Sequence, residues 1–145
     1  MATFNSIGID DLVKSLAAVA EMPVEVQDEI LNAGADELVP AQKAKIRQYG
    51  IYDTSNQETR HVADSIKKGK PKSNKGVRVI YVTASGSRRR GKTTTRNAEI
   101  LFINEFGKRG QAPRPAIQDS TEEAANRVVQ AETRVWDAYL KEKNL

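Results

Sequence analysis

The hydrophobic positions in the first third of the chain recur at helical spacing and predict two helices. Between residues 9 and 21 the apolar side chains lie three or four positions apart, which indicates a short amphipathic helix. Met22 and Pro23 end it, and Pro23 suits the first position of a second helix. A further stripe predicts that second helix over residues 24 to about 48, where Pro40 lacks a backbone donor and can kink or split it. The two stripes consist of Ile9, Leu12, Val13, Leu16, Ala17 and Ala20, and of Val26, Ile30, Ala33, Glu37, Ala41 and Ala44 with Leu38 beside them.

The segment after the second helix carries a weaker helical pattern. Residues 59–68 fit one short helix that turns Val62, Ala63 and Ile66 inward. The following KGKPKSNKG, at about residues 68–76, has the glycine, proline and lysine content of a linker.

Two later segments read as strands. Residues 77–84 alternate and are rich in β-branched side chains, which predicts the first strand, and the apolar segment 97–106 is the second candidate. The polar segment between them, about 85–96, is then a long hairpin loop with a mobile tip. We therefore expect the two strands to be antiparallel neighbours.

The last third of the chain predicts an irregular stretch and then a long helix. Residues 107–119 contain two glycines and two prolines, and Ser120 with Glu123 forms a capping box for a helix that runs to Lys143. The predicted fold is a single α+β domain over residues 1–145. It has two N-terminal helices, a small antiparallel sheet with a long basic hairpin loop, and a long C-terminal helix packed on the sheet. The inward face of that last helix holds Ala124, Val128, Ala131, Val135 and Tyr139, with Trp136 and Leu140 adjoining.

Composition narrows the possible chemistry. The 145 residues match the usual size of one domain. The chain has no cysteine and one histidine, which excludes disulfides, thiolate metal sites, cysteine nucleophiles and a histidine metal cage. We expect no cofactor and no metal. Charged residues interrupt the apolar positions near the start, so that neither a signal peptide nor a membrane span fits, and we expect a soluble protein made in a reducing cytoplasm.

Charge is distributed unevenly along the chain. Residues 67–96 contain eleven lysines and arginines and no acidic residue, whereas the rest of the chain sets twelve basic residues against nineteen acidic ones. Such asymmetry indicates either an anionic partner for the basic third or a solvated loop kept soluble by its charge. Tyr81 is the one aromatic residue in this run, so stacking on single-stranded bases has little support.

Residues 86–93 match the phosphate-binding pattern G-x-x-x-x-G-K-[ST] and follow a predicted strand. In a phosphate-binding loop the Lys and Thr begin a helix whose amides point at the phosphates. Here three consecutive β-branched residues, Thr93 to Thr95, disfavour a helix. The apolar residues 100–105 start only seven positions after Thr93, whereas a crossover helix with its loops needs at least about 10 to 12 residues. We therefore expect no nucleotide hydrolysis.

Other candidate chemistry is sparse, and we expect no enzyme. His61 lies beside a short helix with Asp64 three residues on, which is typical of a half-exposed structural histidine rather than a base. Glu99 and Glu105 fall on one face of the second predicted strand, without other signs of paired-carboxylate hydrolysis. Glu105 is expected to hold Arg109 or Arg114. Trp136 and Tyr139, at helical spacing, are anchors of the core or of a subunit interface.

The order of these pieces resembles the tail-completion or head–tail joining proteins of tailed bacteriophages, a family related to minor tail protein Z. The resemblance covers about residues 9 to 140. The residues that carry it are Asp53, Thr54, Ser65 and Ile66, then Asn104-Glu105-Phe106-Gly107, and then Pro113-Arg114-Pro115-Ala116-Ile117 leading into the final helix.

The resemblance implies a non-enzymatic virion protein of the phage neck, made in the host cytoplasm. It implies a homo-oligomeric ring, of six subunits, at the head-proximal end of the tail. Its neighbours would be connector or stopper, tail-terminator or tail-tube proteins, with double-stranded DNA passing through the lumen and no membrane. On this reading a basic loop meets DNA or an acidic groove of an adjacent ring, and orders on assembly; its residues are Arg88, Arg89, Arg90, Lys92 and Arg96. The expected subunit or partner interface comprises Glu105, Phe106, Arg109, Arg114, Trp136 and Tyr139.

The alternative function is sequence-independent binding of nucleic acid by the basic segment 67–96, for which phosphate contacts give a steep loss of affinity with salt.

Overall fold

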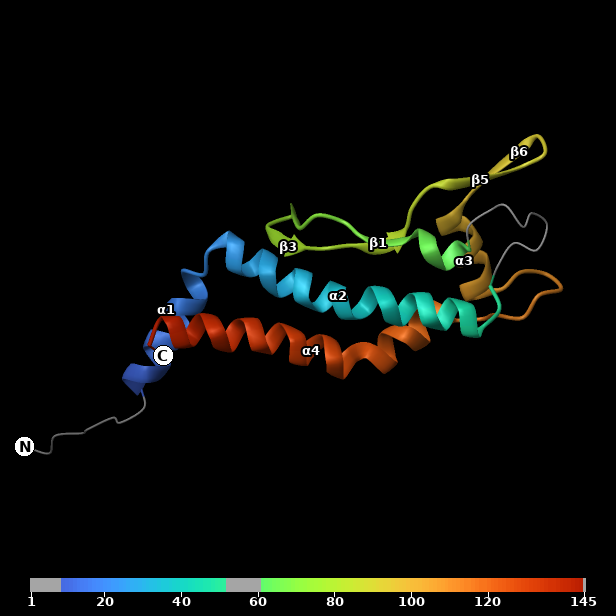
Figure 1. Cartoon of the computed structure of the whole chain (residues 1–145). Coiled ribbons are helices and arrows are strands. Elements are labelled where there is room, and N and C mark those ends of the chain that lie inside the picture. The colour runs from blue at the N-terminus through green and yellow to red at the C-terminus, as the bar shows by residue number, and fades with distance from the viewer. Residues whose placement is uncertain (1–8, 52–60, 145) are drawn as a thin grey trace, which may run out of the picture.

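Two long antiparallel helices form the body of the protein. In the computed structural model, which describes residues 9–51 and 61–144, α2 (Val24–Gln48) and α4 (Ala116–Glu142) lie side by side (Figure 1). The short α1 (Ile9–Ala20) lies at one end of this pair, and α3 (Asn97–Phe106) lies at the other. Pro40 lies inside α2, which continues through it without a break.

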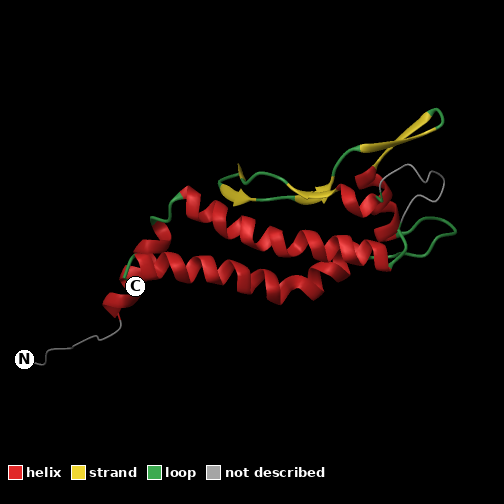
Figure 2. Cartoon of the chain, in the orientation of Figure 1, coloured by secondary structure: helices red, strands yellow, loops and turns green. Residues whose placement is uncertain are grey.

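The strands of residues 66–84 cover α2 on the side away from α4, and those of residues 87–96 project beyond it (Figure 2). A 3-10 turn, η1 (Val62–Ser65), precedes them. The described residues hold three two-stranded antiparallel ladders, in which β1 pairs with β4, β2 with β3 and β5 with β6. The strands are β1 (Ile66–Lys68), β2 (Lys72–Asn74), β3 (Val77–Val79), β4 (Val82–Ala84), β5 (Ser87–Arg90) and β6 (Thr93–Arg96).

The first two ladders are parts of one long ribbon, residues 66–84. The amide of Gly69 donates to the carbonyl of Tyr81 at 2.8 Å and connects them. Lys75 and Gly76, with φ of 50° and 83°, form the tight turn at the tip of the ribbon.

The buried core lies where α2 ends. It joins the C-terminal half of α2 to η1, the β1–β4 ladder, α3 and the first turn of α4; its members are Ile46, Ile51, Val62, Ala63, Ile66, Ala84, Leu101 and Ala116. The first turn of α4 therefore packs on the strands, and the rest of α4 packs along α2. The two helices approach closely at Gly34, where a Cβ would lie 2.3 Å from the Glu132 carboxylate. The fold is α+β, as the sequence predicted.

Several predicted elements were wrong. Residues 97–106 form helix α3 rather than a strand, because a short apolar run fits a buried helix as well as a buried strand. Glu99 and Glu105 therefore do not share the face of a strand. The segment 85–96 is not a loop between two strands, because residues 87–96 form the β5–β6 hairpin and its β-branched threonines lie in β6. The expected linker 68–76 contains strand β2 and the turn of the ribbon.

Other differences concern boundaries and faces. The helix expected over 59–68 is the short turn η1 followed by β1, although Val62, Ala63 and Ile66 are buried as predicted. The strand expected over 77–84 is interrupted at residues 80–81. Helix α2 is covered on two sides, so its buried residues are Gly34, Ala35, Gln42 and Ile46 rather than the predicted stripe.

Candidate functional site

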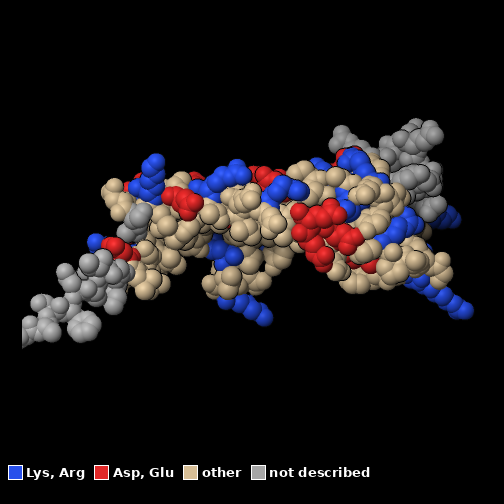
Figure 3. Space-filling model, turned by 90° about the horizontal axis from the view of Figure 1, so that it is seen from below, with Lys and Arg blue, Asp and Glu red and all other residues tan. Residues whose placement is uncertain are grey.

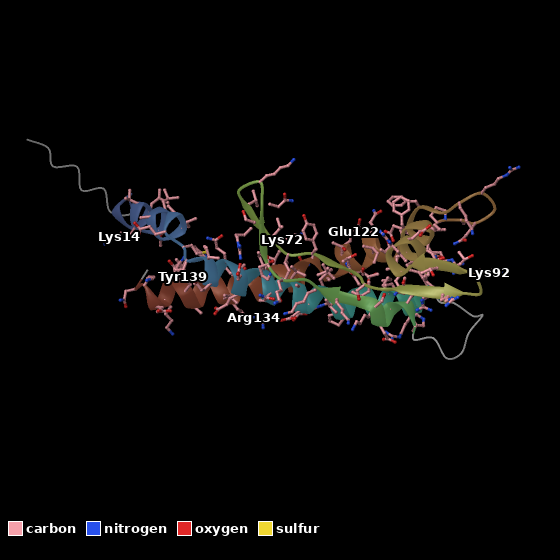
Figure 4. The ribbon with its side chains drawn as sticks, turned by 90° about the horizontal axis from the view of Figure 1, so that it is seen from above. Lys14, Lys72, Lys92, Glu122, Arg134 and Tyr139 are labelled. Carbon is pink, nitrogen blue, oxygen red and sulfur yellow. The ribbon has the colours of Figure 1, made fainter. Side chains whose placement is uncertain are left out.

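The most prominent feature outside the body is the basic hairpin, residues 87–96, which projects beyond α3 (Figure 1). Lys92 lies near its tip, at the end of the molecule opposite Lys14 on α1 (Figure 4). Of the residues predicted to meet a partner, Arg89, Lys92 and Arg96 are exposed. The side chain of Arg90 lies outside the described part of the structure.

Arg88 does not share this exposure. It is 7% exposed, and its Nε donates to Asn97 Oδ1 at 2.9 Å. The Asn97 side chain in turn donates to the Ser85 carbonyl at 2.7 Å, and the Asn97 amide donates to the Gly86 carbonyl at 3.1 Å. Arg88 thus fastens the hairpin to the start of α3, which corrects its assignment to the partner-facing surface.

Ion pairs fasten the basic ribbon to α2. Arg78 donates from Nε and Nη2 to Asp28 over 2.5 to 3.0 Å, and Lys68 lies 2.6 Å from Asp36. The Lys72 ammonium lies over the Tyr81 ring, 4.8 Å from its centroid. Acidic side chains of α2 therefore balance part of the positive charge of the strands. The basic residues of the segment that remain at the surface include Lys67, Lys70, Lys75, Arg89, Lys92 and Arg96.

The segment that matches the phosphate-binding pattern forms a hairpin. Gly91 and Lys92 make the turn, and Thr93–Arg96 is strand β6. The helix α3 begins only after this strand, at Asn97, so that the amides after Lys92 belong to a β-ladder and not to a helix terminus. Residues 100–105 lie within α3 and not on a strand.

An apolar groove of about 420 Å³ lies between β4, α3 and the first turn of α4. Val82, Leu101 and Ile117 line it. Phe102 and Phe106 border it with their rings 4.8 Å apart, and they are 64% and 66% exposed. Sequence reasoning selected Phe106 but missed Phe102. In the predicted strand these two side chains would lie far apart, whereas their i, i+4 spacing on a helix brings them into contact.

A buried amide also faces the apolar groove. Gln42 lines it, is 3% exposed, and leaves its Oε1 without a hydrogen-bond partner among the described residues. A buried polar atom of this kind costs free energy until a donor reaches it.

The motif Asn104-Glu105-Phe106-Gly107 forms the joint between α3 and α4. The Asn104 carbonyl accepts from the Arg114 amide at 2.6 Å, and its Oδ1 accepts from Gln111 at 3.0 Å. The Glu105 carboxylate accepts from the amides of Ile117 and Gln118 at 2.9 and 2.8 Å. It thereby caps the N-terminus of α4, where the helix dipole favours negative charge.

This cap corrects two predictions. Helix α4 begins at Ala116 rather than after Ser120, whose hydroxyl donates to the Ile117 carbonyl at 2.9 Å. Glu105 serves α4 instead of the expected arginine, and Arg114 donates to the carbonyls of Tyr49 and Gly50, at 3.3 and 3.5 Å. Arg109 is exposed in the turn closed by the Lys108–Gln111 bridge. Asp53 and Thr54, which also carry the phage-protein resemblance, lie outside the described residues.

The aromatic pair near the C-terminus stabilises the fold from within. Tyr139 is 6% exposed, and its hydroxyl donates to the Ala18 carbonyl at 3.4 Å, which connects α4 to α1. The ring of the half-buried Trp136 lies 5.8 Å from that of Tyr139. Of the two roles open from the sequence, Tyr139 takes the core role.

His61 has a structural role. Its Nδ1 accepts from the Ala63 amide at 3.1 Å and caps η1. Burial lowers the pKa of the imidazole below its usual range, and the nearby Arg47 adds to this effect. The neutral form is therefore favoured near neutral pH, as a hydrogen-bond acceptor requires.

Acidic side chains gather on the opposite side of the molecule from the strands, toward the start of α4 (Figure 3). The Asp119 carboxylate accepts a hydrogen bond from the Tyr49 hydroxyl, and this bond raises the pKa of Tyr49. The Glu123 Oε1 lies 2.5 Å from the Lys45 Nζ. Within residues 9–51 and 61–144, no cluster of three or more His, Asp or Glu side chains is placed to hold a metal ion.

Comparison with known protein families, curated proteins and solved structures finds no match for this chain. None of the helices that the structure describes is long and apolar enough to span a membrane.

Proposed function

We propose that this protein is a non-enzymatic structural subunit of the neck of a tailed bacteriophage, and that it assembles with further copies of itself into a ring. The observation that carries the proposal is a pair of exposed apolar surfaces at opposite ends of an elongated molecule. One lies on α1 (Leu12, Val13, Leu16 and Val19, which are 49% to 59% exposed), and the other is the apolar groove with Phe102 and Phe106. Soluble monomers rarely expose contiguous apolar patches, whereas subunits of assemblies need them.

The order of elements adds support. The motifs that resemble tail-completion proteins fall at a structural joint, since Asn104, Glu105 and Gly107 set the path from α3 into α4. In the proposed assembly the basic hairpin meets an anionic surface, either DNA in the lumen or the acidic face of a neighbouring ring. Arg89, Lys92 and Arg96 are the exposed cations there.

The deciding experiment is electron microscopy of lysates from a phage with a nonsense codon in this gene, beside the parent phage. We expect full heads next to separate or abnormally long tails, because a missing joining subunit blocks attachment without blocking the assembly of either part. Complementation with the intact gene should restore joined particles. Normal, infectious particles from the nonsense phage would overturn the proposal.

The second candidate function is sequence-independent binding of nucleic acid, and the exposed cations on the basic hairpin favour it. A gel shift at low and at moderate ionic strength separates the two functions. A dedicated binder with six phosphate contacts would lose roughly a thousandfold in affinity between 50 and 200 mM salt. For a ring subunit we expect weak DNA binding at low salt that falls when Arg89 and Lys92 are changed to Glu, whereas Lys141→Glu on α4 leaves it unchanged. Tight binding at 50 mM salt that weakens by roughly a thousandfold at 200 mM would favour the second function.

A further inference from the structure

The apolar face of α1 is the first half of a complementary pair of surfaces. Leu12, Leu16 and Val19 lie at i, i+4 and i+7 and form one stripe, with Val13 beside it, and each is 49% to 59% exposed. A single exposed leucine is ordinary, but four adjacent apolar side chains on one helix form a patch. We call these four residues the α1 stripe.

The apolar groove is the second half. It lies at the far end of the molecule from α1, next to α3 and the basic hairpin (Figure 1). Its wall is mostly apolar, and its border is formed by the exposed rings of Phe102 and Phe106. The buried Gln42, whose Oε1 has no hydrogen-bond partner among the described residues, is one of its lining residues. An amphipathic helix is a recurrent occupant of a groove of this kind.

The α1 stripe cannot reach the groove of its own chain. Gln42 lies about 27 Å along α2 from Val24, at 1.5 Å per residue. From Leu16 to the start of α2 the chain spans at most about 20 Å, even with residues 21–23 fully extended. The hydrogen bond from Tyr139 to Ala18 further holds α1 at the other end of the molecule. A second copy of the chain can supply the helix that its own α1 cannot.

Charge favours this pairing. Helix α1 carries Asp11 in its first turn and is followed by Glu21, with Lys14 as its one basic residue. At the groove end, residues 87–109 contain seven basic residues against two acidic ones, Glu99 and Glu105 on α3, and the acidic side chains at the start of α4 lie on the side away from the strands. Among the basic residues, Arg89, Lys92 and Arg96 are exposed on the hairpin. An acidic helix would therefore approach a basic end, which aligns two copies head to tail.

We infer that the α1 stripe of one subunit docks in the apolar groove of the next. This inference rests on the proposed function, since it names the contact that builds the ring. The contact joins different surfaces of the two copies, so it is heterologous, and repetition closes into a ring when the rotation between subunits permits.

Site-specific cross-linking tests this contact cleanly, because the chain has no cysteine of its own. Leu16→Cys and Phe106→Cys are prepared as separate full-length proteins; both positions are exposed, at 59% and 66%, so that neither change disturbs the core. Each is treated with a short bismaleimide, alone and as a mixture. We expect cross-linked dimer in the mixture and little in either protein alone, since a head-to-tail contact brings residue 16 of one copy to residue 106 of another.

The matched control replaces Phe106→Cys by Val129→Cys, an apolar position on α4 that is 59% exposed and far from the groove. The yield with Leu16→Cys should then drop to the background level.

The outcomes separate the inference from the proposed function. If the cross-link between residues 16 and 106 forms in no higher yield than that between residues 16 and 129, the inference is overturned. It is also overturned if Leu16→Cys alone or Phe106→Cys alone gives the dimer, because the contact would then be symmetric. The nonsense-phage experiment decides the neck function independently. A specific 16–106 cross-link in a protein whose loss leaves normal phage would establish the contact and reject the neck function.

Discussion

Replacing Gly107 by alanine is expected to destabilise the protein by about 3 kcal/mol or more, enough to lower the melting temperature by roughly 10 °C. Gly107 has φ of 75° and ψ of 179°, a backbone conformation that essentially only glycine adopts. A Cβ there would also lie 2.8 Å from the Gln111 carbonyl oxygen and 3.0 Å from the Pro113 nitrogen. Both neighbours are backbone atoms, so no side-chain rotation relieves the overlap.

Gly110→Ala is the matched control for this prediction. Gly110 lies in the same loop and has φ of 80°, but a Cβ there would meet no atom within 4 Å. Its cost should be confined to the backbone conformation, about 1 kcal/mol. Thermal unfolding followed by circular dichroism measures both variants. Equal melting temperatures for the two would contradict the close approach at Gly107.

Glu105→Gln is expected to cost about 2 kcal/mol of stability and to loosen the start of α4. The carboxylate accepts from two amides, of Ile117 and Gln118, and the charge interacts with the helix dipole. Glutamine keeps one acceptor, brings an NH₂ group toward the second amide, and removes the charge. Hydrogen exchange at these two amides should rise before that in the middle of α4.

Glu99→Gln separates the cap from a general loss of negative charge. Glu99 also lies in α3 and is exposed, in the first turn of its own helix, where loss of the charge should cost only about 0.3 to 1 kcal/mol. Urea unfolding compares the two variants by their midpoints. If Glu105→Gln proves no more destabilising than Glu99→Gln, the carboxylate does not cap α4.

The Glu105→Gln and Gly107→Ala variants also bear on the proposed assembly, because Phe106 lies between these two positions. The cap by Glu105 and the turn at Gly107 fix where α3 ends, and hence where Phe106 stands at the border of the apolar groove. In the proposed assembly, Glu105 and Gly107 therefore act mainly through the fold. Their functional consequence is the shape of the groove that α3 helps to form.

The sequence by itself determined the elements with long and regular patterns. The stripes over residues 9–21 and 24–48, and that of the last helix, extend over several turns, and helical periodicity is unambiguous at such lengths. The α+β class followed from these helices and from the β-branched segments between them. The inward positions Val62, Ala63 and Ile66 were also predicted correctly, because burial of apolar side chains does not depend on which local conformation presents them.

Only the tertiary structure decided the short elements. The apolar run at 97–106 fits either a helix or a strand, and it becomes α3 because Leu101 then joins the core. The charges of residues 67–96 predicted either an anionic partner for the whole segment or a solvated loop, yet Arg78 and Lys68 pair with acids on α2, and Arg88 is buried against Asn97. Pairings of this kind join positions far apart in the chain, which local pattern does not encode.

The residues of the candidate site also fall into two groups, those named from the sequence and those found only in the structure. The sequence named the cations of the hairpin, from their charge, and Phe106, from the family resemblance, as candidates for a surface that meets a partner. It did not find Phe102, the unsatisfied Gln42 or the groove itself, and it assigned Glu105 to an arginine instead of to α4. A groove is a property of surfaces brought together from β4, α3 and α4, so it exists only once the chain has folded.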